Sequence, residues 1–216
     1  GRYVVPDLPE AEYEVFARGY GLVDTQRVTT MPGEIVNLTA AAAPDKRTAA
    51  EIYPAQYWYA MLELPPESDF PGTGPAGNGI AQNIHSQGAF VARVVNTDGC
   101  TGCHQMGNKA TREIPQSILD ASEDSKGAWD RRVLSGQAGG GMSARFNQVG
   151  LDRVLGMFAD WSDRVADGEL PSAEPPRPQG RERDVVVTMW DWASEKAYLH
   201  DEISSDKRDP TVNANG

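Results

Sequence analysis

The stretch Cys100-Thr101-Gly102-Cys103-His104 decides how the rest of this chain is interpreted. It holds both cysteines of the 216-residue chain and one of its three histidines. Two cysteines separated by two residues also occur in redox dithiols and as half of a zinc site. No second cysteine pair is present to complete a zinc site, and no strand-helix-strand pattern surrounds this one. The histidine directly after the second cysteine therefore becomes the informative residue.

That histidine predicts a covalently attached haem. In such a motif the two thiols form thioether bonds with the vinyl groups on one edge of the porphyrin, and the imidazole binds the iron. We therefore expect one haem c, with Cys100 and Cys103 as the attachment residues and His104 as an axial iron ligand. A disulfide or a thioredoxin-like dithiol is the competing interpretation.

Length and charge narrow the possible partners. A chain of 216 residues is longer than most single domains, so two modest domains are expected. The formal net charge is −11 and no basic block is present, which disfavours nucleic acid and favours a basic redox partner. The sequence contains no apolar run of about 18 residues, so it predicts no membrane-spanning helix.

The motif also predicts a location. Haem attachment of this kind takes place on the outer side of the bacterial cytoplasmic membrane, so we expect a periplasmic or otherwise exported protein. The sequence shows no signal peptide at its start. We therefore expect it to be a fragment or a processed product.

The first 40 residues predict β structure. Short runs with alternating apolar and polar residues are separated by turns that contain proline or glycine, which is typical of antiparallel strands. These runs are residues 3–5, 13–17, 27–29 and 35–38. We expect a small antiparallel sandwich with no catalytic constellation.

The next segments predict the domain boundaries. Residues 40–62 carry alanines and aromatic residues at helical and mixed spacing, which indicates either a packed seam between domains or an aromatic binding stripe. The predicted fold is multidomain α and β. It has a partial β-sandwich at 1–64, a proline- and glycine-rich linker at 65–79, a mainly helical domain at 80–170 and a C-terminal extension at 171–216. The extension begins with a proline-rich linker and contains one predicted β-strand at residues 184–192.

Two amphipathic helices are predicted around the motif. The first covers residues 86–96 and ends just before the attachment residues. The second covers residues 151–165, has one apolar stripe and stops before Gly168.

The helix before the motif carries Gly88 and Phe90, and this combination resembles the class I monohaem cytochrome c domains. The resemblance implies that the last helix crosses the first one closely at Gly88. It also implies that the carbonyl of Pro115 accepts a hydrogen bond from the second ring nitrogen of His104.

The sixth iron ligand needs a lone pair on the haem face opposite the histidine. Met142 lies in a glycine-rich stretch, residues 136–146, which predicts a flexible loop that wraps the haem and resembles the distal loop of the same family. Ser143 stands where that family has a proline. Met106 is tethered on the histidine side, and Met157 lies in the last helix as a core residue. We therefore expect Met142 to be the sixth ligand.

Two further resemblances concern the ends of the chain. The strings Gly1-Arg2-Tyr3, Pro6-Asp7-Leu8-Pro9 and Pro32-Gly33-Glu34 resemble the carboxypeptidase regulatory-like domains, which are transthyretin-like sandwiches. In that resemblance Gly1 falls within the domain, so leading strands are missing. With the tail Trp190-Asp191-Trp192, the whole chain is similar to the N-terminal region of bacterial proteins that continue into a streptogramin-lyase-type β-propeller. The resemblance implies a possible β-propeller partner.

These observations lead to one main functional hypothesis and two alternatives. The main one is a cytochrome that passes single electrons to or from a redox partner or a fused domain, with no catalytic residues of its own. One alternative is the haem-containing part of an oxidoreductase or lyase whose catalytic domain is absent from this sequence. The other is a haem-based ligand sensor with an open sixth position.

Overall fold

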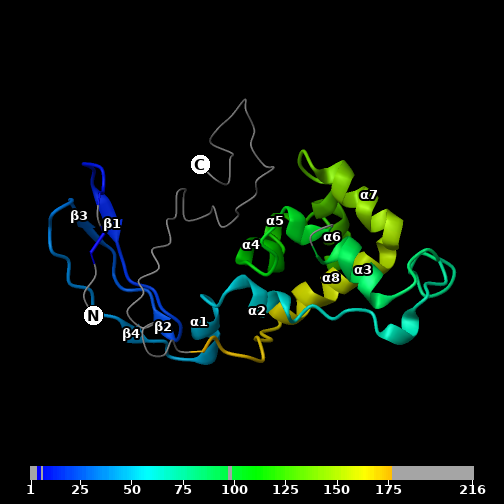
Figure 1. Ribbon diagram of the computed structural model, residues 1–216, viewed down its shortest axis with the longest axis horizontal. Helices are drawn as coiled ribbons and strands as arrows, with labels where there is room; N and C mark the ends of the chain where they lie inside the picture. The colour runs from blue at the N-terminus through cyan, green and yellow to red at the C-terminus, as the bar shows by residue number, and fades with distance from the viewer. Residues whose placement is uncertain (1–3, 6, 97–98, 177–216) are drawn as a thin grey trace. The chain divides into compact units, whose positions relative to one another are not determined.

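The computed structural model describes residues 4, 5, 7–96 and 99–176. These residues form two compact units that divide between Tyr53 and Pro54, and residues 172–176 group with the first unit. Figure 1 shows short strands in the first unit and helices in the second. The predicted boundary at residue 64 was therefore placed too far along the chain.

The first unit contains two small antiparallel sheets and one short helix. Strand β1 (Tyr13–Val15) pairs with β3 (Val28–Thr30), and β2 (Leu22–Val23) pairs with β4 (Ala41–Ala42). Helix α1 spans Lys46–Ala50. The mixed α and β character and the antiparallel pairing agree with the prediction.

The strand positions agree with the sequence pattern only in part. The runs at 13–17 and 27–29 contain β1 and β3, whereas the run at 35–38 forms no strand. Ala41 and Ala42, expected in a segment of helical or mixed spacing, pair with β2 instead. Hydrogen bonds to a neighbouring strand override the helical preference of alanine here.

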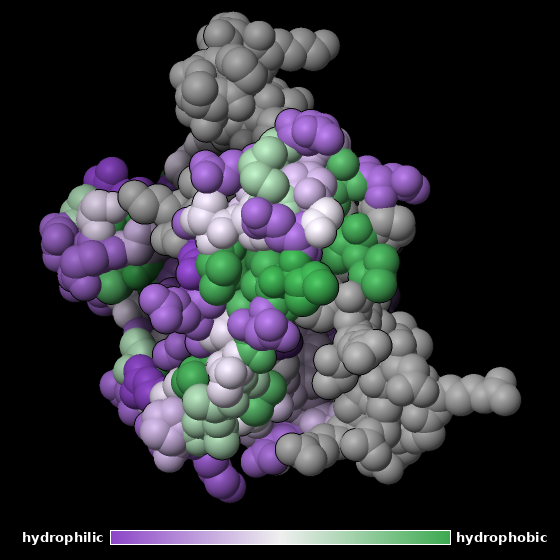
Figure 2. Space-filling model, turned by 90° about the vertical axis from the view of Figure 1, so that its left-hand side faces the viewer, coloured by the Kyte–Doolittle hydropathy of each residue, from purple (hydrophilic) through white to green (hydrophobic). Residues whose placement is uncertain are grey.

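Hydrophobic side chains are exposed on the first unit. Val4 is 87% exposed and Ile35 is 89% exposed. Figure 2 shows hydrophobic surface bordered by hydrophilic residues on the side that carries the strands. Two-stranded sheets of this length cannot cover all of the apolar residues beside them.

The second unit is helical. Its elements in chain order are α2 (Ala55–Tyr59), η1 (Glu67–Asp69), α3 (Gln87–Val94), η2 (Cys100–Gly102), α4 (Lys109–Arg112), α5 (Gln116–Leu119), α6 (Ser125–Leu134), α7 (Gly139–Val149) and α8 (Leu151–Ala166). The predicted helices at 86–96 and 151–165 correspond to α3 and α8. Polar side chains cap the starts of α3, α4 and α6; at α3, Ser86 Oγ accepts from the Ala89 amide at 3.2 Å.

Helix α8 lies at the centre of the second unit. Phe158 and Trp161 are fully buried on it. The Trp129 ring of α6 is 4.9 Å from Phe158, and the Phe146 ring of α7 stacks on the other side at 5.6 Å. Aromatic contacts of this kind join α6, α7 and α8 into one core.

A single residue, Gly150, joins α7 to α8. Its backbone φ of +132° is one that residues other than glycine rarely adopt, and a Cβ atom there would collide with the Gly79 carbonyl. The sharp joint lets two consecutive helices pack against each other.

The predicted helix crossing at Gly88 is wrong. Helix α3 packs against α7, whereas α8 packs against α6 and α7. A Cβ atom at Gly88 would meet only Ser86 Oγ, at 3.9 Å. The position beside α3 is taken by α7, so this glycine permits no close approach of the last helix.

The predicted linker at 65–79 packs within the second unit. The Gly72 amide donates to the carbonyl of the fully buried Ile84 at 2.9 Å. Asp69 forms a 2.7 Å ion pair with Arg153 of α8. Proline and glycine therefore shape a wrapped segment here instead of separating two domains.

Two further predictions bear on the rest of the chain. No helix in the described part of the chain is long and apolar enough to cross a membrane. The strand predicted at 184–192 lies outside the described residues.

Candidate haem-attachment site

The two cysteines and the histidine lie on one tight turn. In η2, the amides of Cys103 and His104 both donate to the Cys100 carbonyl, at 3.2 and 2.9 Å. These two hydrogen bonds hold Cys100, Cys103 and His104 close together along the backbone. Both thiols are free and partly exposed. This donor set fits a haem held by two thioethers and one imidazole.

The Cys100 thiol is in a desolvated environment. Burial raises the pKa of Cys100 to about 12, while the nearby Arg145 guanidinium acts in the opposite direction. The residue keeps some exposed surface, but the protein around its sulfur excludes enough water to disfavour the thiolate. The thiol is therefore protonated at neutral pH.

Tyr59 of α2 borders the attachment turn. Its hydroxyl donates to the Val95 carbonyl at 3.0 Å, and its ring meets Trp161 at 5.8 Å. Burial raises the pKa of Tyr59, and the neighbouring Cys100 adds to that effect. Tyr59 thus links the end of α3, the attachment turn and the core helix α8.

The chain after the histidine turns sharply at Gly107. Its φ is +93°, and a Cβ atom there would collide with the Ala55 carbonyl of α2. The Thr111 hydroxyl accepts from the Gly107 amide at 2.8 Å, and Arg112 donates to the Gly107 carbonyl at 3.1 Å. Both backbone groups of Gly107 are therefore held by α4.

Met142 lies on a helix, which corrects the prediction of a flexible loop. Helix α7 begins at Gly139, which is buried so closely against the Leu134 carbonyl that a Cβ atom would not fit. The packing of α7 against α3, α6 and α8 overrides the low helix propensity of three consecutive glycines. Met142 is partly buried, and the Cβ positions of Gly140 and Gly141 face open space.

Helix α7 runs beside the attachment turn. Arg145 follows Met142 by three residues, so the two side chains lie on neighbouring parts of one helix face. Because Arg145 acts electrostatically on the Cys100 thiol, this part of α7 lies near the motif.

Met106 and Met157, the other two methionines considered as ligands, are buried. Met157 lies on α8 as a core residue, as predicted. Met106 is also buried, and its amide donates to the His104 carbonyl at 3.0 Å. A residue tied so closely to the histidine has little freedom to reach the opposite side of a haem.

Pro115 precedes α5 and is exposed. Its carbonyl accepts from the amides of Ile118 and Leu119, at 2.9 and 3.2 Å. The carbonyl therefore starts a helix in this structure, and its hydrogen bond to His104 stays a prediction.

The remaining candidates are not gathered at the turn. Trp129 donates its indole N–H to Ser162 in the core at 3.0 Å. Arg131 and His85 are exposed, and His200 lies outside the described residues. In the part of the chain that the structure describes, no three His, Cys, Asp or Glu side chains form a metal-binding group.

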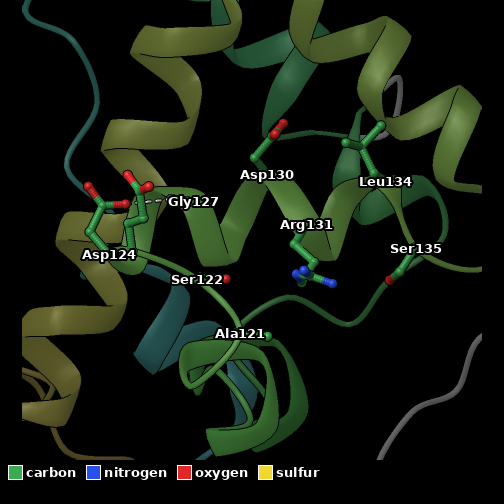
Figure 3. Close-up of a pocket in the computed structure, with 9 residues that line it drawn as sticks. Ala121, Ser122, Asp124, Gly127, Asp130, Arg131, Leu134 and Ser135 are labelled. Carbon is green, nitrogen blue, oxygen red and sulfur yellow. Dashed lines mark hydrogen bonds between the residues drawn. The ribbon is translucent and has the colours of Figure 1, made fainter.

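A shallow depression lies beside α6, away from the motif in sequence. Figure 3 shows Asp124, Asp130 and Arg131 around it, with Leu134 and Ser135 at the end of the helix. Neither the cysteines nor His104 line it. We therefore assign it no role in cofactor attachment.

Comparison with known proteins found no matching family model, no matching curated protein and no matching solved structure.

Sequence reasoning missed several residues around the turn. Tyr59 was seen only as part of an aromatic cluster, and Arg145 and Thr111 carried no motif at all. Their roles depend on contacts between segments far apart in the chain. The one available signal was Gly107, since a glycine soon after the motif suggests a tight turn.

Proposed function

We propose that this protein is a c-type cytochrome that carries single electrons through one covalently bound haem. It acts as a domain or subunit of a larger redox protein in the periplasm or another exported location. The observation that carries the proposal is the single turn on which the free thiols of Cys100 and Cys103 accompany His104. A haem held there supplies reversible one-electron exchange at its iron.

The chain's own residues have separate roles in this proposal. Cys100 and Cys103 would hold the cofactor to the chain, and His104 would supply an imidazole nitrogen to the iron. Met142, on α7, would supply a thioether sulfur to the iron. A thioether ligand stabilises the reduced iron more than a second imidazole does, which raises the reduction potential.

The surrounding side chains limit access of water to the site. Tyr59 packs against the buried Trp161, and Met106 is buried two residues after His104. Reduced access of water is one of the factors that set a haem potential. The same packing holds the backbone on both sides of the motif.

The partner in this proposal is another protein or a fused domain. A net charge of −11 favours a redox partner with a basic surface and disfavours nucleic acid. A β-propeller domain is one partner that the sequence resemblance suggests. Salt should weaken such an encounter because it screens the charges of both proteins.

The first test is covalent attachment. The chain is exported in a bacterium that has haem-attachment machinery, and a denaturing gel is stained for haem. We expect staining of the parent chain, weaker staining of each single variant, Cys100→Ala or Cys103→Ala, and none of the double variant. Full staining of the double variant would refute the proposal.

The second test concerns the iron ligand. We expect His104→Ala to keep the thioethers but to lose the stable low-spin visible spectrum, because the axial nitrogen is gone. An unchanged spectrum would mean that His104 is not the ligand. Carbon monoxide added to the reduced parent protein separates a cytochrome from a sensor, since an occupied sixth position resists binding and an open one does not.

A further inference from the structure

Arg132 reaches from α6 to the end of α4. Its guanidinium donates to the carbonyls of Thr111 and Glu113, at 3.3 and 3.1 Å, and also to the carbonyl of Ala110. Carbonyls in the last turn of a helix lack amide partners within that helix. One planar cation therefore satisfies the end of α4 from outside.

The guanidinium is itself firmly supported. It lies 4.8 Å from the ring centroid of Trp129, which donates to Ser162 of α8 at 3.0 Å. Burial lowers the pKa of Arg132 to about 10, so the side chain is still charged at neutral pH. The arginine thus joins α4 to the aromatic core of the second unit.

The end of α4 controls the turn that follows His104. Arg132 binds the carbonyl of Thr111. The buried hydroxyl of the same residue accepts a hydrogen bond from the Gly107 amide at 2.8 Å. Glu113, whose carbonyl Arg132 also binds, lies two residues before Pro115 in the chain. Arg132 therefore restrains the C-terminal end of α4, which follows His104 in the chain.

We propose that Arg132 is a positioning residue for His104, which it keeps in one orientation by holding the end of α4. This inference rests on the proposed role of His104 as an axial ligand of a haem. Without the guanidinium, three carbonyls must find water, and the turn at Gly107 loses part of its support. The imidazole then samples more than one orientation at the iron.

The test compares four variants of the haem-loaded full chain. Arg132→Gln removes the charge and the planar fork, and Arg132→Lys keeps the charge without the fork. Val133→Ala, at the next buried position of α6, costs stability without touching Arg132. Arg131→Gln changes an exposed arginine of the same helix. Electron paramagnetic resonance of the ferric protein reports the orientation of the axial imidazole.

We expect one low-spin species in the parent, in Val133→Ala and in Arg131→Gln. Contacts from a charged donor favour one conformer by about tenfold or more, so a second species should become visible in Arg132→Gln. Arg132→Lys should lie between the two. A single parent-like species in Arg132→Gln, or the same new species in Val133→Ala, would overturn the proposal. If Arg132→Gln yields no folded protein, the comparison of Arg132→Lys with Val133→Ala decides.

Hydrogen exchange separates this inference from the proposed function. We expect the Gly107 amide to exchange about tenfold faster or more in Arg132→Gln, with or without haem, because its support is weakened. A parent protein without covalent haem would refute the cytochrome assignment and, with it, the positioning role of Arg132. A parent with haem, but with no change in exchange or resonance in Arg132→Gln, would refute the positioning role alone.

Discussion

The guanidinium of Arg112 lies over the indole ring of Trp58, 4.0 Å from the ring centroid. Arg112 is buried, and it also donates to the Gly107 carbonyl. The backbone carbonyl of Trp58 accepts a hydrogen bond from the indole N–H of Trp161 at 3.0 Å. One buried cation therefore connects the chain after His104 to α2 and, through α2, to α8.

Replacing Arg112 should destabilise the second unit strongly. Arg112→Met removes a charge-assisted hydrogen bond and a desolvated cation–π contact, so we expect a loss of about 2–4 kcal/mol. Urea unfolding followed by tryptophan fluorescence measures the change. Arg131→Met, at an exposed position, is the control and should stay within about 0.5 kcal/mol. Equal effects of the two substitutions would mean that Arg112 makes no net contribution.

Gly107 and Gly141 should respond in opposite directions to alanine. Gly107→Ala places a Cβ atom against the Ala55 carbonyl at a φ of +93°, and we expect a loss of about 3 kcal/mol or more. Gly141→Ala adds a methyl group in open space within α7, and we expect a gain of about 0.5–1 kcal/mol. Thermal unfolding of both apoproteins provides the comparison. Tolerance of alanine at 107 would contradict the close approach of α2.

Met142→Ala should open the iron without releasing the haem. A thioether bound to ferric haem gives a weak charge-transfer band in the far red, and we expect this band to disappear while carbon monoxide binding to the reduced protein increases. Met157→Leu conserves volume in the core, so its cost should stay below about 1.5 kcal/mol and its spectrum unchanged. If the band survives in Met142→Ala and is lost in Met157→Leu, the sulfur ligand is Met157.

The apoprotein should show an unreactive thiol at position 100. Because burial raises the pKa of Cys100 to about 12, alkylation at pH 8.5 should be about a thousandfold slower in the folded chain than in urea. Mass spectrometry of the Cys103→Ala variant measures alkylation of Cys100 alone. The Cys100 thiol stays protonated to a higher pH in the folded chain than in the unfolded chain. The free energy of unfolding should therefore fall as pH rises from about 9 to 12. Equal alkylation rates in both states would show that Cys100 is accessible.

The sequence predicted the framework of the second unit because local patterns determine it. The apolar stripe of α8 and its stop at Gly168 follow from helical periodicity, and Ser86 marks the start of α3. The attachment turn follows from a short motif whose chemistry depends on spacing alone. In these segments the information lies within a few residues of the structure that it specifies.

The segments that were predicted wrongly depend on distant contacts. The glycines at the start of α7 favour a loop by themselves, and the packing of α7 against α3, α6 and α8 makes a helix favourable. Residues 65–79 resemble a linker, but the ion pair between Asp69 and Arg153 ties them to α8. Composition carries no information about partners that are many residues away.

The buried thiol of Cys100 has a consequence for maturation. Two cysteines three positions apart can close into a disulfide before any cofactor arrives, and an oxidising compartment favours that reaction. Disulfide formation by exchange begins with attack by a thiolate. Under the proposed function, a fold that keeps Cys100 protonated would slow this competing reaction and would leave the chain more time in the reduced form that thioether formation requires.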